Sequence, residues 1–166
     1  MSLLPTTDRF TAIARALLGG LVALVFVVSV EAASIEIRNE SDLEFGAVIA
    51  STTGGSVTVT PAGQRVISGV YNWGAGTFGA ARFTVQVDES GNPHFTITLP
   101  SSLTLTNGSV DSLLVTDFQS LPTGTGMAQP PQRTATVDVG ATLQVAPQQP
   151  GGSYSGTFPV IVNLGN

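Results

Sequence analysis

Short runs in which apolar and polar residues alternate recur along most of this chain, and turn-forming residues separate them. In residues 94–99, for example, Phe95, Ile97 and Leu99 alternate with histidine and threonine. A period of two places successive side chains on opposite faces of a β-strand. The pair Asn107-Gly108 is typical of tight hairpin turns. About ten or eleven such runs without helical periodicity predict an all-β, antiparallel sandwich or barrel.

We expect strands at residues 34–38, 43–50, 56–60, 65–71, 81–87, 94–99, 102–106, 113–118, 134–139, 141–146 and 154–164. Residues 119–132 contain so much proline and glycine that we predict neither strand nor helix there. Loops of this length are often functional or mobile.

The N-terminal region has the pattern of a secretory signal. Arg9 and Arg15 precede the apolar, uncharged run 16–30, and the small residue Ala32 follows it. This order predicts a signal peptide over residues 1–32, which leaves residues 33–166 as a single β-sandwich domain. The run is shorter than the roughly 20 residues of a membrane span. A retained N-terminal anchor is the alternative.

Charge and cysteine content narrow the classes of partner. The chain has no cysteine and a net charge of −5. An acidic balance disfavours nucleic acid and anionic membrane surfaces as partners. Without disulfides, the exported domain must be held by its core, by an added partner strand, or by both.

Residues for catalysis or metal binding are sparse. His94 is the one histidine of the sequence, and alternation directs it away from Phe95 and Ile97 toward solvent. A catalytic triad needs an oriented imidazole, and zinc or copper sites need histidine or cysteine ligands. Glu36 and Glu44 are expected on outward strand faces, whereas a glycosidase needs two carboxyl groups across a cleft. We therefore predict no enzyme activity, no catalytic residues, no metal and no cofactor.

Three aromatic residues, Tyr71, Trp73 and Phe78, flank a glycine-rich loop at residues 72–80. Aromatic side chains on loops can stack on sugars, so these are candidate ligand-binding residues. The alternative is a hydrophobic plug that closes one end of the sandwich.

The final run, residues 154–164, alternates Tyr154, Phe158, Val160 and Val162 with polar residues and proline. The sequence ends two residues later. This pattern predicts a half-buried strand at the end of the sequence. Because proline lacks an N–H, Pro159 favours an edge or a bulge within it.

Five motifs carry a family resemblance. They are LEFG at residues 43–46, ARFTV at 81–85, FTITLP at 95–100, VGATLQV at 139–145 and PGGSYSGTF at 150–158. In this order they resemble an uncharacterised domain-of-unknown-function family of secreted bacterial proteins. That family is in turn similar to chaperone–usher pilin subunits, including the spore-coat-U-like type.

The pilin resemblance implies an immunoglobulin-like sandwich that lacks one strand. The C-terminal strand would border the gap, a periplasmic chaperone would engage it, and the N-terminal segment of an identical or related subunit would fill it. Tyr154, Phe158, Val160 and Val162 would then belong to the accepting strand. Ile35 and Ile37 lie in residues 34–38, which either form a donor segment or complete their own sandwich.

The expected function is therefore that of a secreted structural protein, a pilin-like fimbrial subunit that assembles or interacts by β-strand addition. Its location would be the cell surface or the extracellular space, reached through the periplasm. The alternative is a self-contained secreted binding module that recognises a carbohydrate or surface ligand through residues 71–78 or 119–132.

Overall fold

The structure, a computed structural model, describes residues 33–89 and 91–165, and every regular element within them is a β-strand. The strands are β1 (Ser34–Ser41), β2 (Glu44–Phe45), β3 (Val48–Ile49), β4 (Gly55–Val59), β5 (Arg65–Ser68), β6 (Tyr71–Asn72), β7 (Phe78–Gly79), β8 (Ala81–Asp88), β9 (His94–Thr98), β10 (Ser102–Thr106), β11 (Ser112–Leu121), β12 (Thr125–Met127), β13 (Thr134–Val145) and β14 (Ile161–Leu164). No helix in these residues is long and apolar enough to cross a membrane. The predicted signal peptide lies outside the described residues.

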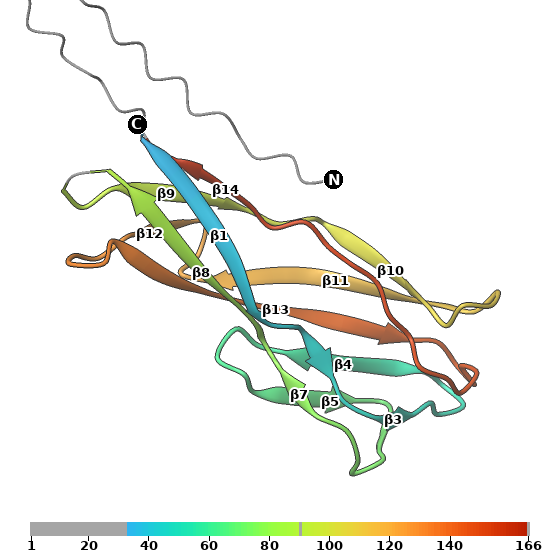
Figure 1. Cartoon of the computed structure of the whole chain (residues 1–166). Coiled ribbons are helices and arrows are strands. Elements are labelled where there is room, and N and C mark those ends of the chain that lie inside the picture. The colour runs from blue at the N-terminus through green and yellow to red at the C-terminus, as the bar shows by residue number, and fades with distance from the viewer. Residues whose placement is uncertain (1–32, 90, 166) are drawn as a thin grey trace, which may run out of the picture. The chain divides into compact units, whose positions relative to one another are not determined.

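Seven strands form one large antiparallel sheet, in which β1, β8, β13, β11 and β10 are neighbours in that order. The long strand β13 pairs with two different strands along one edge. Its residues 134–139 pair with β8, and its residues 141–145 pair with β4, which in turn pairs with β5. The sheet therefore divides into a β8–β1 arm and a β5–β4 arm and curls across the domain (Figure 1).

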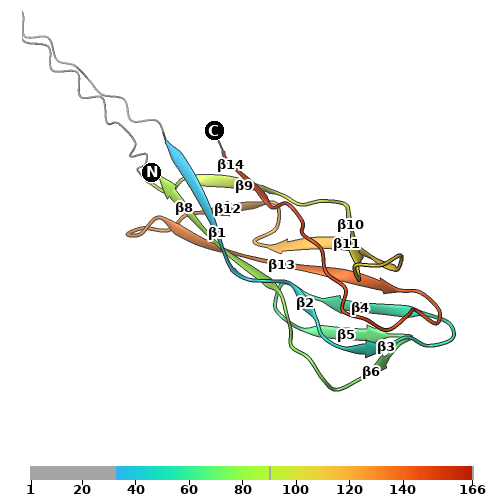
Figure 2. The ribbon, with the colours of Figure 1, turned by 45° about the vertical axis from the view of Figure 1, so that its right-hand side comes forward.

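Three smaller pairings supply the rest of the fold. The strands β12, β9 and β14 form one antiparallel sheet, whereas β2 pairs with β7 and β3 pairs with β6. After β13 the chain runs back across the domain and ends in β14, which lies beside β1 in both views (Figures 1 and 2).

The core consists of two clusters of apolar side chains. The first cluster comprises Ala81, Val85, Val87, Phe95, Ile97, Ala128, Val137 and Val139. The second cluster lies on the β5–β4 side of the domain and comprises Val57, Leu105, Leu113, Val115, Ala141, Leu143 and Val145. Burying apolar surface contributes about 25 cal/mol per Å² to the free energy of folding. The β-branched residues, which favour strands, therefore also stabilise the fold when their side chains are buried.

The all-β antiparallel prediction is confirmed, and the alternation is visible in the burial pattern. In β9, Phe95 and Ile97 are buried, whereas His94, Thr96 and Thr98 are exposed. Such a sheet has one face on the core and one in water.

Residues 65–71 form the two strands β5 and β6 instead of one strand, and the two strands predicted at 134–139 and 141–146 form the single strand β13. The predictions for three other segments also need correction. Residues 119–132 are not wholly irregular, because β11 extends to Leu121, β12 follows, and Ala128 is fully buried. Of the predicted strand 154–164, β14 covers only Ile161–Leu164.

The third correction concerns residues 43–50, which form the short strands β2 and β3 instead of one strand. Gly46 lies between them with a positive φ of 71°. A glycine adopts this left-handed conformation at little cost, and here it interrupts the alternation. As a result, Phe45 and Val48 both pack on the second cluster, while Ile49 is exposed.

Candidate strand-binding groove

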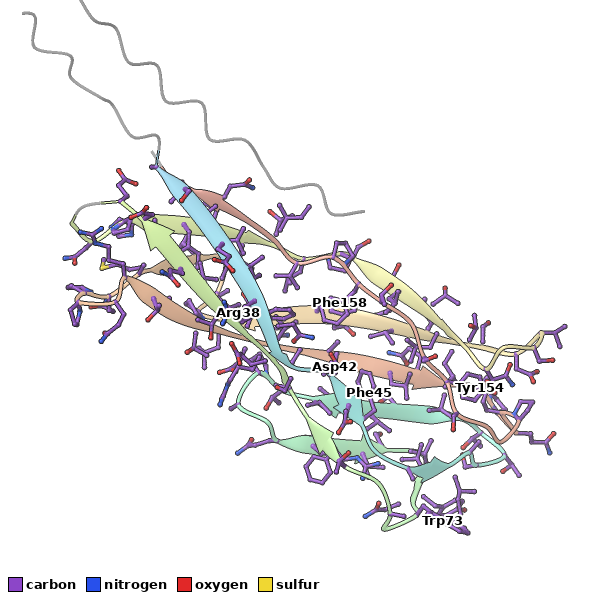
Figure 3. The ribbon with its side chains drawn as sticks, in the orientation of Figure 1. Arg38, Asp42, Phe45, Trp73, Tyr154 and Phe158 are labelled. Carbon is purple, nitrogen blue, oxygen red and sulfur yellow. The ribbon has the colours of Figure 1, made fainter. Side chains whose placement is uncertain are left out.

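A long apolar groove lies over the second cluster. It has a volume of about 970 Å³ and runs between residues 42–50, the first wall, and residues 148–158, the second wall. Strands β10, β11 and β13 supply the floor, which consists of Leu103, Leu105, Leu113, Val115, Leu143 and Val145. Figure 3 shows Asp42 and Phe158 toward one end of the groove and Tyr154 toward the other. The two walls therefore run in opposite directions.

The first wall is paired along one edge. Glu44 and Phe45 pair with β7, and Val48 and Ile49 pair with β6. No strand of the described chain pairs with the other edge of these residues. An unpaired strand edge presents a row of N–H and C=O groups that can bond to an added strand.

Arg65 of β5 anchors the first wall from beneath. One guanidinium nitrogen donates to the Ala47 carbonyl oxygen at 3.1 Å, and another donates to Asn72 Oδ1 at 3.2 Å. Its Cζ atom also lies 5.4 Å from the centre of the Phe78 ring, within cation–π range. A side chain at Gly46 would crowd this guanidinium, since a Cβ there would lie 3.3 Å from Cζ. Arg65 thus ties β3, β6 and β7 to the large sheet.

The second wall is anchored at both ends and unpaired between them. The Tyr154 hydroxyl donates to the Pro150 carbonyl oxygen at 2.8 Å, and Ser155 exchanges backbone hydrogen bonds with Thr106. Residues 161–164 then pair with β9 as β14. Between these anchors, the backbone groups of residues 156–159 have no backbone hydrogen-bond partner among the described residues. This stretch is a second free edge.

Aromatic contact closes one end of the groove. The rings of Phe118 and Phe158 lie 5.0 Å apart at 45°, a tilted arrangement typical of favourable aromatic pairs. Phe158 also packs against the first core cluster. The groove is therefore open along the second cluster and closed by packed side chains where the first cluster begins.

The groove has an acidic end. Asp42 and Glu44 are the charged residues among those that line it, and both are exposed. Asp42 accepts a hydrogen bond from Asn39 Nδ2 at 2.8 Å. The shortest ion pair of the described residues, 2.7 Å between Arg82 and Asp138, lies outside the groove on the large sheet, where Asp138 raises the pKa of Arg82 by a hydrogen bond and by its charge.

The predicted site residues of the last run are distributed over the groove and the core. Tyr154 and Phe158 line the groove, as its second wall. Val160 and Val162 instead pack on the first cluster. The predicted strand 154–164 thus contributes one half to the groove and the other half to the core.

Residues 34–38 pair with β8 in the same chain, as part of β1. Ile35 packs against the first cluster, and Ile37 is 38% exposed. Of the two roles left open for this segment, the structure shows completion of its own sheet. It remains an edge strand that buries little, since Ile35 is the one residue of β1 that is not exposed.

The three aromatic residues of the predicted ligand loop are all exposed. Tyr71 and Trp73 are 65% and 63% exposed. Tyr71 pairs with the exposed Ile49, whereas Phe78 pairs with Phe45 on the core side and contacts Arg65. Tyr71 and Phe78 thus belong to different two-stranded sheets, and Phe78 is itself 49% exposed.

Sequence reasoning missed the first wall and the floor as parts of a site. The residues concerned carry ordinary strand patterns, and their role depends on which segments lie opposite them. The glycine of the LEFG motif, Gly46, could have indicated an irregularity in this segment, because a glycine inside a strand pattern often marks a bulge or a close approach. In the structure it has a positive φ.

Among the described residues, no group of three or more His, Cys, Asp or Glu side chains is placed to hold a metal ion. The groove offers backbone edges, apolar side chains and two carboxylates.

No curated protein and no solved structure matches the chain. One family model matches residues 35–164, most of the chain, and its description is a domain of unknown function. The chain therefore belongs to the DUF4402 family.

Proposed function

We propose that this protein is a secreted, pilin-like structural subunit of the bacterial cell surface that joins its partners by β-strand addition. The observation that carries the proposal is the groove with a free backbone edge on each wall and an apolar floor. Strand addition needs those features: main-chain hydrogen bonds supply affinity, and alternate side chains of the added strand enter the groove.

The dimensions of the groove suit a short extended segment. The first wall spans residues 42–50, and eight residues of strand cover about 26 Å. Alternate residues of an inserted strand would place three or four side chains on the floor. Because the walls run in opposite directions, the strand would lie parallel to one wall and antiparallel to the other.

The pilin resemblance supports this function in a second way. It implies an immunoglobulin-like sandwich with one strand missing beside the C-terminal segment, and the groove lies beside that segment. We propose that residues 42–50 and 153–164 correspond to the two strands that flank the gap in pilins. Since β1 is paired with β8 in its own chain, this segment does not fill the groove, and we propose that the added strand comes from another molecule.

Thr157→Pro tests the proposal in cells. The Thr157 N–H has no backbone partner among the described residues, so its removal should cost the isolated domain little. The fixed φ of proline and its missing donor should nevertheless hinder this stretch from pairing as a regular strand. Thr157→Val, which keeps the N–H, is the control. Filaments are sheared gently from expressing cells and analysed by mass spectrometry.

We expect the wild type and Thr157→Val in the filament fraction, and Thr157→Pro as free, folded protein. Absence of the wild-type protein from sheared filaments would refute the fimbrial role. Equal incorporation of both variants would show that assembly does not use this edge.

A second candidate function, carbohydrate recognition, is favoured by the high exposure of Tyr71 and Trp73. Exposed aromatic rings can stack on sugar faces. A glycan array with the wild type and Trp73→Ala distinguishes this function, because a structural subunit acting through the groove should show no binding that depends on Trp73.

A further inference from the structure

We infer that the strand accepted by the groove belongs to a different protein and carries a lysine or arginine where it passes Asp42 and Glu44. This inference rests on the proposed strand addition and adds the chemistry of the partner. Asp42 and Glu44 are the charged side chains among the residues that line the groove. Neither takes part in an ion pair within the described part of the chain.

The nearby arginines are already engaged elsewhere. Arg65 donates to Ala47 and Asn72, and Arg82, which lies opposite Ser41 in the β1–β8 register, is paired with Asp138 at 2.7 Å. The acidic end of the groove is therefore left without a cation from this chain's described residues. An added strand with a basic residue there gains attraction to two carboxylates, whereas an acidic residue is repelled by both.

An identical copy is a poor source of this strand. Its exposed alternating segment is β1, which offers only Ile35 and Ile37 as apolar residues and is paired with β8. In β1, Arg38 is outnumbered by Glu36 and Glu40, so the segment brings a net charge of −1. A whole copy would also bring a net charge of −5. Charge complementarity therefore favours a basic strand from another polypeptide.

Synthetic peptides test the inference on the full-length chain. A dye-labelled peptide of about eight residues alternates threonine with valine, leucine and isoleucine, the length being that of the first wall. It carries one arginine at its N-terminal or its C-terminal end, and matched peptides carry glutamate instead. A further peptide has the sequence of residues 34–41. Affinities are measured by fluorescence anisotropy up to about 1 mM peptide, at about 0.02 M and about 0.5 M salt.

We expect the better of the two arginine peptides to bind about three- to tenfold more tightly than its glutamate match at low salt. The preferred arginine position reports the direction of the strand, because the first wall runs away from Asp42. The preference should shrink at high salt and in Asp42→Asn/Glu44→Gln. It should persist in the control Glu36→Gln/Glu89→Gln, which removes two exposed charges from residues that do not line the groove.

Three results would overturn the inference, and they differ in what they leave standing. Equal binding of arginine and glutamate peptides would remove the charge preference but keep strand addition. Tighter binding of the 34–41 peptide would identify an identical copy as the donor. If no extended peptide bound at about 1 mM, the proposed function would fail together with the inference.

Discussion

At the scale of single residues, Arg65 determines where the first wall lies. Its two hydrogen bonds, to Ala47 and Asn72, join a strand of the large sheet to segments that otherwise contact that sheet through apolar packing. The Asn72 side chain also accepts from the Gly74 N–H, so the loop after β6 depends on the same oxygen. The Arg65 Nε–H is buried without a partner, which subtracts from the stabilisation that the residue provides.

We predict that Arg65→Met lowers the free energy of unfolding by about 1–3 kcal/mol, because two hydrogen bonds of a charged group are lost while most of the apolar volume is kept. Urea denaturation measures this loss. Arg38→Met, at an arginine whose side chain is 69% exposed, is the control and should change stability by no more than about 0.5 kcal/mol. Similar losses in both variants would contradict the anchoring role of Arg65.

Gly140 is a second residue whose identity the fold requires. It lies in β13 between Val139, the last residue paired with β8, and Ala141, the first residue paired with β4. A Cβ at Gly140 would overlap the carbonyl oxygen of Val59. Gly140→Ala should therefore destabilise the protein by about 1–3 kcal/mol, the range for overpacking, as measured by chemical denaturation.

Gly79→Ala is the matched control for Gly140→Ala. Gly79 also lies in a strand, has no positive φ, and has open space where its Cβ would be. We expect a change within about 0.5 kcal/mol. If Gly140→Ala proved as mild as Gly79→Ala, the approach of the end of β4 to β13 at Gly140 would be looser than the structure indicates.

At the scale of elements, β1 is the least buried of the long strands. It pairs with β8 along its length, yet Ile35 is the one residue that is not exposed. We predict that Ile35→Ala costs about 1 kcal/mol, whereas Val85→Ala, at a fully buried position of β8, costs about 2–3 kcal/mol. Equal costs in denaturation experiments would show that β1 contributes more to the core than its burial implies.

The alternation in the sequence predicted the elements that lie across the core and failed where the chain departs from a regular pleat. In β8 and β9 one face is mostly buried and the other is mostly exposed to solvent, so the two-residue period of the sequence predicts these strands correctly. At Gly46 the backbone turns left-handed, and the same period then assigns Ile49, which is 43% exposed, to the buried face.

The groove could not be predicted from local sequence patterns. Tyr154 and Phe158 were recognised as candidate residues, but nothing in their own segment indicates that residues 42–50 lie opposite, more than one hundred residues earlier in the chain. That proximity comes from the split pairing of β13 and from the Arg65 contacts, which are long-range. Sequence patterns of period two identify faces of strands, whereas they do not identify which free edges meet.

At the scale of the whole domain, the two walls and the floor should respond to an added strand as one unit. A peptide that binds the folded domain and not the unfolded chain stabilises it by about 2.7 kcal/mol at a concentration of 100 times its Kd. For a domain of this size we expect a rise in Tm of about 10 °C.

Because backbone pairing is the proposed mode of binding, amide hydrogen exchange should slow in residues 43–50 and in residues 156–158 together. Pro159 has no amide hydrogen and is not observed. A peptide of the same composition with its apolar residues grouped at one end controls for nonspecific adsorption, since it cannot place alternate side chains on the floor. Protection confined to β6 and β7 would place the ligand on the aromatic loop instead, and a rise in Tm without protection of either wall would exclude strand addition as its cause.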